Sequence, residues 1–346
     1  MPLPEILLPH APVVLGTAAA LVGAFLATAF VRRSARAGGF VDEAESLDGA
    51  VRRVPLGGGI AVLAALGAGA ALAFRSGIPP TALRVILLTL AMGLVGLRDD
   101  ARPMRPAVKL LLQTIVVSSA YAALRDDGFR ITVLPGGEPV ACATTILWVL
   151  AVTNAMNLFD HEDGSSAGVG SIAAAMLSAT AFQTGQGMEG TLLAILSGAL
   201  AGFLPHNFPP ARIFLGDAGS LSVGFLLGTL TVMQTFWAPE TTPWRFAAPL
   251  LCLAVPLFDS ALVVAIRLRE RAPVFRGDRN HFTHRLIALG MTRREAVLSL
   301  YGLAFCLSVG APILYALPPY VAQVALLQAI GVLCLTALLE RAGRRR

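Results

Sequence analysis

Residues 154–164 read Asn-Ala-Met-Asn-Leu-Phe-Asp-His-Glu-Asp-Gly, so two amides and three acids follow directly after a long apolar run. Ionisable groups at membrane depth are costly, and they persist where they line a wet cavity, bind an ion or lie at the interface. A polar interfacial loop is the plain alternative for a single acid. Acids recur in other loops of this chain, which favours a functional site.

The composition is that of a membrane protein. Of 346 residues 55% are hydrophobic and 14% charged, and the mean hydropathy is +0.71. A soluble core could not bury so much apolar surface, so we expect an all-α polytopic integral membrane protein. The net charge of +6 comes from arginines in short loops between apolar runs, which indicates membrane topology and no nucleic-acid partner.

Apolar runs long enough to cross about 30 Å of hydrocarbon predict about 11 transmembrane helices. They lie near residues 6–31, 55–74, 81–97, 108–124, 141–157, 165–183, 190–205, 218–236, 247–267, 297–316 and 321–340. The first run has no basic residue before it and Arg32, Arg33 and Arg36 after it, the reverse of a cleaved signal peptide. The N-terminus is therefore expected outside and the C-terminus in the cytoplasm.

This topology places nearly all positive charge on the cytoplasmic side. Outward loops would hold only five of the 27 basic residues: Arg75, Arg84, Arg125, Arg130 and Arg245. Such an asymmetry is the positive-inside pattern. One outward segment, residues 130–134 before Pro135-Gly136-Gly137, is expected to form a short hairpin.

The polar motifs fall in loops on the predicted cytoplasmic side, about residues 32–54, 98–107, 158–164, 206–217 and 268–296. Asp259 lies within an apolar run and is a functional candidate for that reason. The triplet Gly57-Gly58-Gly59 has two interpretations, amides that approach an anion or close helix packing, of which packing is the more common. The only lysine, Lys109, is either an interfacial anchor or part of a site.

The loop 268–296 gathers arginines with His281 and His284. Two histidines three residues apart could bind zinc, but no third soft ligand lies nearby and the four cysteines, without CxxC spacing, are expected to fill the core. Arginine and histidine together favour a grip on phosphate or pyrophosphate. Carboxylates and amides suit magnesium, with substrate phosphates completing its shell. The residues therefore predict a magnesium site, a phosphorylated substrate and a second, membranous substrate.

From Gly57 to about Gly290 the chain also resembles the polyprenyl-phosphate N-acetylhexosamine 1-phosphate transferases. That family has four motifs in a fixed order: paired aspartates with a following Lys and Gln, an NxxNxxDGxDG motif, an FLGDxGS loop and a DRNHxHHRL loop. The matching positions here are Asp99, Asp100, Lys109, Gln113, Asn154, Asn157, Asp160, Asp163, residues 214–220 with Asn207 upstream, and residues 278–286.

The resemblance implies a role for each matching residue. Asp99, Asp100, Lys109 and Asp217 would be catalytic, and magnesium, or manganese, would be held by Asp217, Asp100 and Asn157. Asp99 would deprotonate or orient the lipid phosphate, Lys109 would neutralise phosphate charge, and Phe214 would stack on the uracil. The implied substrate-binding residues are Asn154, Asn157, Asp160, Asp163, Asn207, Phe214, Arg279, His281 and His284.

The implied protein is a single transmembrane transferase domain, residues 1–346, in the bacterial cytoplasmic membrane. It would transfer a sugar 1-phosphate, N-acetylglucosamine-like, from a UDP-sugar to undecaprenyl or another polyprenyl phosphate and release UMP, the first membrane step of cell-envelope polysaccharide or glycoconjugate synthesis. Membrane lipids, and in one alternative a second copy of the chain, are the further partners.

The chain departs from the family pattern in one loop and one turn. His161 stands where the family has Gly, Glu162 replaces an apolar neighbour, and Thr283 replaces a His. These departures leave two alternatives open, a shifted sugar donor or a catalytically silent member. An aspartate-rich membrane prenyltransferase is a third alternative, but it would need two DxxxD-like motifs on facing helices. We expect the side chains of His161 and Glu162 to turn away from the phosphates.

Overall fold

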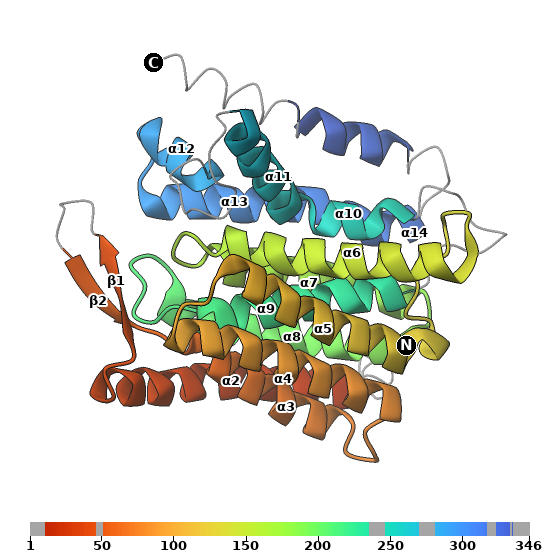
Figure 1. Ribbon diagram of the computed structural model, residues 1–346, viewed down its shortest axis with the longest axis horizontal. Coiled ribbons are helices and arrows are strands. Elements are labelled where there is room, and N and C mark those ends of the chain that lie inside the picture. The colour runs from red at the N-terminus through yellow and green to blue at the C-terminus, as the bar shows by residue number, and fades with distance from the viewer. Residues whose placement is uncertain are drawn as a thin grey trace, which may run out of the picture.

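The computed structural model describes residues 11–45, 51–234, 246–269, 281–316, 323–332 and 334, which form a bundle of helices with one small hairpin (Figure 1). The elements are α2 (Ala11–Ala37), β1 (Val41–Glu45), β2 (Val51–Pro55), α3 (Gly58–Ala73), α4 (Pro80–Ala101), α5 (Pro106–Leu124), η2 (Arg125–Asp127), α6 (Gly137–Phe159), α7 (Ser165–Gln183), α8 (Gly187–Asn207), α9 (Gly216–Met233), α10 (Ala248–Cys252), α11 (Ala254–Arg269), α12 (Phe282–Ala288), α13 (Arg293–Ser308) and α14 (Gly310–Ala316).

Eight helical segments among these residues are long and apolar enough to cross a membrane. They are α2, α4, α5 with η2, α6, α7, α8, α9 and α13 with part of α14. The prediction of a mostly helical, polytopic membrane protein is confirmed at this level. The predicted runs 55–74 and 321–340 form shorter apolar helices, α3 and Gln323–Val332 in the part of the chain that is described.

The predicted span 247–267 is a broken helix. It divides at Leu253 into α10 and α11, and Leu253 has the non-helical backbone angles φ −103° and ψ 10°. Pro256 then lies in the first turn of α11. Backbone N–H groups in a first turn have no intrahelical acceptor, so a proline there costs no hydrogen bond. The expectation of one continuous helix here was wrong.

The hairpins also differ from expectation. An antiparallel pair, β1 and β2, fills much of the loop 32–54, with Val41 opposite Pro55, although the fold was predicted as all-α. Its strands are charged and lack a strict alternation of apolar and polar residues, the usual strand signal. The hairpin expected at 130–134 does not form: the N–H of Ile131 donates to Thr145 Oγ1 of α6 at 2.8 Å, so the segment lies against a helix.

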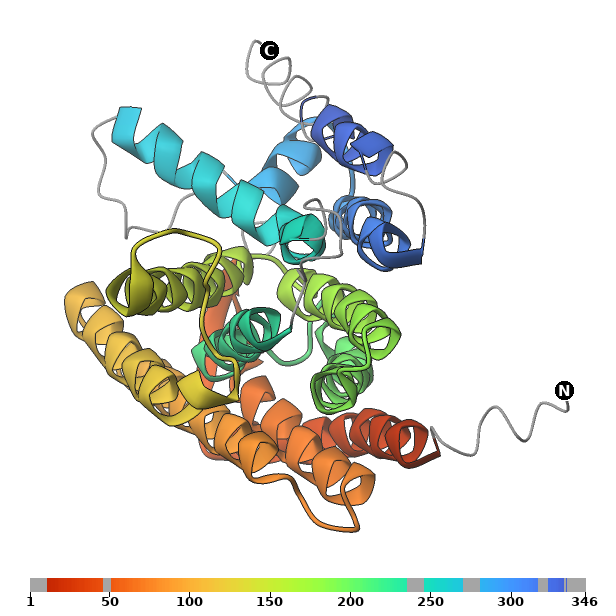
Figure 2. The same ribbon diagram turned by 90° about the vertical axis from the view of Figure 1, so that its right-hand side faces the viewer.

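Helix α9 lies at the centre of the bundle (Figure 2), and every residue from Ala218 to Met233 is buried. It packs against α3, α4 and α6. Small residues at these contacts let helix backbones approach closely, which is how helices associate without a hydrophobic driving force in lipid. A Cβ on Gly59 of α3 would be 2.2 Å from Gly219 N, and one on Gly96 of α4 would be 2.2 Å from Asp217 O.

The glycine triplet therefore serves packing. The N–H groups of Gly58 and Gly59 donate to the carbonyl oxygens of Phe214 and Leu215 at 3.0 and 2.8 Å. These amides are occupied by the chain itself, so the alternative in which they hold an anion is wrong for both residues. The contact also fixes where α9 begins, because Leu215 immediately precedes that helix.

Gly59→Ala is expected to destabilise the protein, because the new methyl group collides with the backbone of α9 and such overpacking costs about 1–3 kcal/mol. Gly67→Ala on the same helix is the matched control: its Cβ meets open space, and alanine favours the helix by about 1 kcal/mol. Thermal unfolding in detergent measures both. Equal unfolding midpoints for the two variants would contradict the packing interpretation.

Candidate active site

Lys109 of α5 lies among oxygens from three other helices. Its Nζ is 2.9 Å from Asp99 Oδ2 of α4, contacts Asp217 Oδ2 of α9, and donates to Asn157 Oδ1 of α6 at 3.2 Å. The Lys109 side chain is only 16% exposed, so Coulomb attraction here is weakly screened. We call these four residues the Lys109 cluster. This placement favours the interpretation of Lys109 as a site residue over that of an interfacial anchor.

Asp100 holds the start of α9. Its Oδ1 accepts from the N–H of Asp217 at 2.8 Å, and its Oδ2 accepts from the N–H of Ala218 at 3.0 Å. The first N–H groups of a helix have no intrahelical partner, and a carboxylate there also meets the positive end of the helix dipole. Gly216, with φ 72°, brings the chain close enough that a Cβ would be 2.8 Å from Asp100 Oδ2. Asp100 therefore positions Asp217.

Two amides on one face of α6 extend the cluster. Asn157 Nδ2 donates to Asp217 Oδ1 at 2.7 Å and to Ser220 Oγ at 2.9 Å, and Asn154 Nδ2 donates to Gln113 Oε1 at 2.7 Å. Gln113 Nε2 is buried without a hydrogen-bond partner among the described residues. A buried donor of this kind costs about 1–3 kcal/mol. An acceptor oxygen of a substrate would relieve that cost.

The turn after α6 is fastened to the loop between α8 and α9. Asn207 Oδ1 accepts from the N–H of Gly164 at 3.1 Å, and Asn207 Nδ2 donates to the carbonyl of Ile213 at 3.0 Å. Asp163 Oδ2 accepts from the N–H of Ala211 at 2.7 Å. Asn207 and Asp163 were predicted as binding residues, and in this structure they hold two predicted site loops together. Arg52 of β2, which sequence reasoning missed, donates to the carbonyl of Ala211.

The acids of the turn carry raised pKa values. Burial raises the pKa of Asp160 well above its ordinary value, and repulsion from Asp217, Asp100 and Asp163 raises it as well. Burial also raises the pKa of Asp163, and the hydrogen bond that Asp163 accepts from the N–H of Ala211 opposes this rise. Asp160 thus adds acidic character beside Asp100 and Asp217, and Asp217 already contacts the Lys109 ammonium group. The site has an excess of negative charge that a bound cation would relieve.

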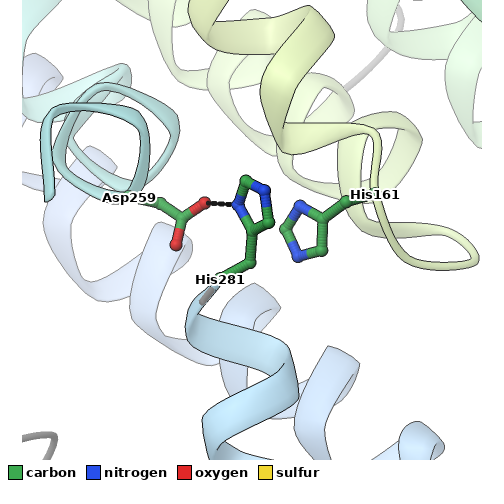
Figure 3. A group of neighbouring side chains, drawn as sticks. All are labelled: His161, Asp259 and His281. Atoms are coloured by element: carbon green, nitrogen blue, oxygen red, sulfur yellow. Dashed lines mark hydrogen bonds and ion pairs between the residues drawn. The ribbon is translucent and has the colours of Figure 1, made fainter. Parts of the chain in front are cut away.

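His161 lies face to face with His281 (Figure 3): the ring centroids are 3.8 Å apart and the planes differ by 15°. His161 Nε2 is 2.5 Å from Thr283 Oγ1, and Nδ1 is 3.2 Å from the carbonyl of Leu158. Burial, followed by the charge of His281, lowers the pKa of His161 to about 3. The ring is therefore neutral near pH 7, with Nδ1–H donating to Leu158 and Nε2 accepting from Thr283.

Asp259 fixes the orientation of His281. Its Oδ2 is 2.7 Å from His281 Nδ1 (Figure 3), and its Oδ1 accepts from the N–H of Phe282 at 2.8 Å. A carboxylate at Nδ1 selects the tautomer and leaves Nε2 to meet another group. The ligand-type atoms of His161, Asp259 and His281 lie within 4.8 Å of one another. Hydrogen bonds within the protein account for this arrangement.

Glu162 and His284 lie beside this histidine pair. Glu162 Oε1 is 3.7 Å from Arg293 Nε, and Glu162 Oε2 is 3.9 Å from His284 Nδ1. Burial raises the pKa of Glu162, and the charge of Arg293 opposes the rise. Phe214 bonds through its backbone to Pro55 and Gly58. Arg279 lies outside the described residues.

The fold and the site together define a polytopic membrane protein with a charged, largely buried cluster at the ends of its helices. Over residues 82–235 the chain matches the profile of glycosyl transferase family 4. It is 30% identical to the protein named "Probable undecaprenyl-phosphate N-acetylglucosaminyl 1-phosphate transferase" of Bacillus subtilis, over 85% of this chain and 82% of that one.

Two further relatives extend the comparison. The decaprenyl-phosphate N-acetylglucosaminephosphotransferase of Mycolicibacterium smegmatis is 30% identical over 83% of this chain and 78% of its own length. The phospho-N-acetylmuramoyl-pentapeptide-transferase of Rubrobacter xylanophilus is 32% identical over 64% of this chain and 74% of its own. The chain belongs to glycosyl transferase family 4, which confirms the resemblance found in its motifs.

His161→Gln should flatten the dependence of stability on pH. The pKa of His161 in the folded protein, about 3, lies below the ordinary value of about 6.5. A depressed histidine pKa gives stability that is complete above the unfolded value and is lost as the pH falls below it. Between pH 7 and pH 5 this one group should cost about 2 kcal/mol.

Thermal unfolding of wild type and His161→Gln at both pH values checks this expectation. Other titrating groups act equally in the two proteins, so the difference between them isolates His161. A wild-type midpoint that falls no further than the variant's on acidification would contradict the assigned neutral, buried ring.

Proposed function

We propose that the protein transfers a sugar 1-phosphate, N-acetylglucosamine 1-phosphate or a close relative, from a UDP-sugar to a polyprenyl phosphate and releases UMP. The observation that carries the proposal is the Lys109 cluster, in which acids, an amide and the only lysine converge from four helices in a member of this family. Phosphoryl transfer needs in-line positioning and charge neutralisation more than covalent chemistry. Converging charged and amide groups supply both.

Magnesium fits the donor set of this site, and manganese is the alternative ion. Asp99 Oδ2, Asp217 Oδ2 and Asn157 Oδ1 all lie around one cation, the Lys109 ammonium, so hard oxygens already converge where positive charge is favoured. Asp217 and Asn157, with Asp100 beside them, would hold the ion. When bound, it would neutralise phosphate charge and polarise the phosphoryl oxygen.

The chain's own residues have distinct tasks in this proposal. Lys109 moves its ammonium group to the incoming phosphate, which releases Asp99 to orient or deprotonate the phosphate of the lipid. Asp160, Asp163 and the asparagines of α6 position the nucleotide, and Phe214 stacks on the uracil. His281, oriented by Asp259, presents Nε2 to the donor phosphates together with Arg279 and His284. A charged partner is worth most in a site that excludes water.

The proposed location is the bacterial cytoplasmic membrane, with the site facing the cytoplasm, where UDP-sugars are made. The distribution of arginine supports this orientation by the positive-inside rule. Eleven crossings, with the N-terminus outside, remain the proposed topology. The product would enter envelope polysaccharide or glycoconjugate synthesis.

Asp217→Asn is expected to lower UMP release by at least about a hundredfold, the usual loss on removing one charge-stabilising group. Neutralising this residue removes the oxygen charge that faces Lys109 and the proposed ion. UMP release from a panel of UDP-sugars, with undecaprenyl phosphate and magnesium, measures the effect. Asp126→Asn, at an exposed acid in η2, is the control and should stay active.

The same assay tests the ion. Wild-type activity should vanish with EDTA and return with magnesium, and thermal unfolding should show that Asp217→Asn is folded. Full activity in chelator would overturn the magnesium proposal. A folded wild type that is silent toward every UDP-sugar would favour the catalytically silent alternative.

Single cysteines test the orientation, in a protein whose four native cysteines are replaced by serine. Arg212→Cys should be protected from an impermeant thiol reagent in intact cells, because the loop between α8 and α9 is proposed to face the cytoplasm. Val133→Cys, which is exposed in the loop before α6, should be labelled. Labelling of residue 212 from outside would contradict the proposed sidedness.

A further inference from the structure

A cavity of about 310 Å³ lies beside the hairpin and is lined mainly by arginine. The lining residues come from the last turns of α2, from β2 and from the loop between α8 and α9. They are Arg32, Arg36, Arg52, Arg53, Val54, Pro55, Ala211 and Arg212. We call this the arginine pocket. It shares no residue with the Lys109 cluster.

The positive charge of the pocket is poorly compensated. Arg53 Nε is 3.6 Å from Glu43 Oε1 across the hairpin, and Arg52 donates to a backbone carbonyl. Within the described parts of the chain, no carboxylate forms an ion pair with Arg32, Arg36 or Arg212. Guanidinium groups that line one cavity repel one another, and a shared anion reduces the repulsion. Their planar forks suit the oxygens of a phosphate.

The pocket lies at the end of a candidate membrane-spanning helix, where a bilayer would have its headgroups. Arg32 and Arg36 belong to the end of α2, a helix apolar enough to cross the membrane. In Figure 1 the hairpin lies at the same end of the bundle as α12, which carries part of the candidate active site. Basic pockets at the ends of membrane helices are the usual sites for anionic lipid headgroups.

An apolar surface continues from the pocket along α2. Val22 and Phe25 lie on the same helix face as Arg32 and Arg36, at helical spacing, and are 52% and 43% exposed. Phe25 packs beside His206 with ring centroids 4.8 Å apart, so its position is fixed. This surface would lie against acyl chains while the arginines hold a headgroup. Inorganic phosphate has no group to cover it.

We propose that the arginine pocket binds the phosphate headgroup of an anionic phospholipid of the surrounding membrane. The phosphate lies among Arg32, Arg36 and the arginines of the hairpin, and one acyl chain follows Val22 and Phe25 along α2. The bound lipid joins α2, the hairpin and the Ala211 loop. This site is separate from the polyprenyl phosphate site of the proposed reaction.

The test is native mass spectrometry of the delipidated full-length protein titrated with phosphatidylglycerol. The wild type should retain one phosphatidylglycerol more tightly than any further copy and more tightly than phosphatidylcholine. Because each arginine near the surface contributes about 1 kcal/mol, Arg32→Gln with Arg36→Gln should weaken that site about thirtyfold. Arg33→Gln, on the same turn of α2 but outside the pocket lining, should retain the lipid.

Thermal unfolding in phosphatidylcholine nanodiscs checks that the variants fold, and a second double variant, Val22→Ser with Phe25→Ser, tests the apolar surface. Equal retention of phosphatidylglycerol by wild type and the arginine variant would overturn the proposal. So would an equal loss in Arg33→Gln, which would indicate general surface attraction. Displacement by inorganic phosphate would assign the pocket to a soluble anion, and preferential retention of undecaprenyl phosphate would assign it to the substrate; either result overturns the lipid assignment.

Discussion

The carboxylate of Asp100 at the N-terminus of α9 is the interaction on which the rest of the site depends. It joins the end of α4 to the start of α9 across 117 residues of chain. Without it, two partly buried N–H groups at the helix start would lose their partner. Helices α3 and α4 can approach the start of α9 this closely because residues 59, 96 and 216 are glycines. A Cβ atom at any of these positions would collide with the neighbouring segment. Asp217 and Ser220 are then presented by one rigid helix that is buried along its length.

Charge is distributed unevenly around that helix. The Lys109 cluster and the turn after α6 are rich in acid, whereas the arginine pocket on the other side of the Ala211 loop is rich in base. Ala211 lies between them: its N–H donates to Asp163 and its carbonyl accepts from Arg52. One residue thus separates a region that favours cations from a region that favours anions. Such an arrangement suits the proposed reaction, which would bring a metal ion and lipid-borne phosphate together.

Local signals in the sequence were sufficient for the class, for most helices and for the residues that converge on Lys109. Apolar runs give helices reliably in membranes because lipid forces backbone groups to pair within the segment. The hairpin was missed because its strands are charged, and the break at Leu253 because an apolar run does not reveal where hydrogen bonding changes. Partners distant in sequence also could not be predicted. His161 and Thr283 were noted as two separate departures, yet they are 2.5 Å apart in the folded protein, so they form one contact.

Lys109 is the only lysine of the chain, and it lies inside the candidate site. The protein therefore has a single side-chain amine, which contacts two carboxylates from neighbouring helices. Reagents that acylate or cross-link primary amines, which usually modify a protein surface at many places, would find their side-chain target here only in the candidate active site. The lysine-poor surface leaves arginine to carry nearly all the positive charge at the membrane, and the side-chain amine chemistry of the molecule is confined to the Lys109 cluster.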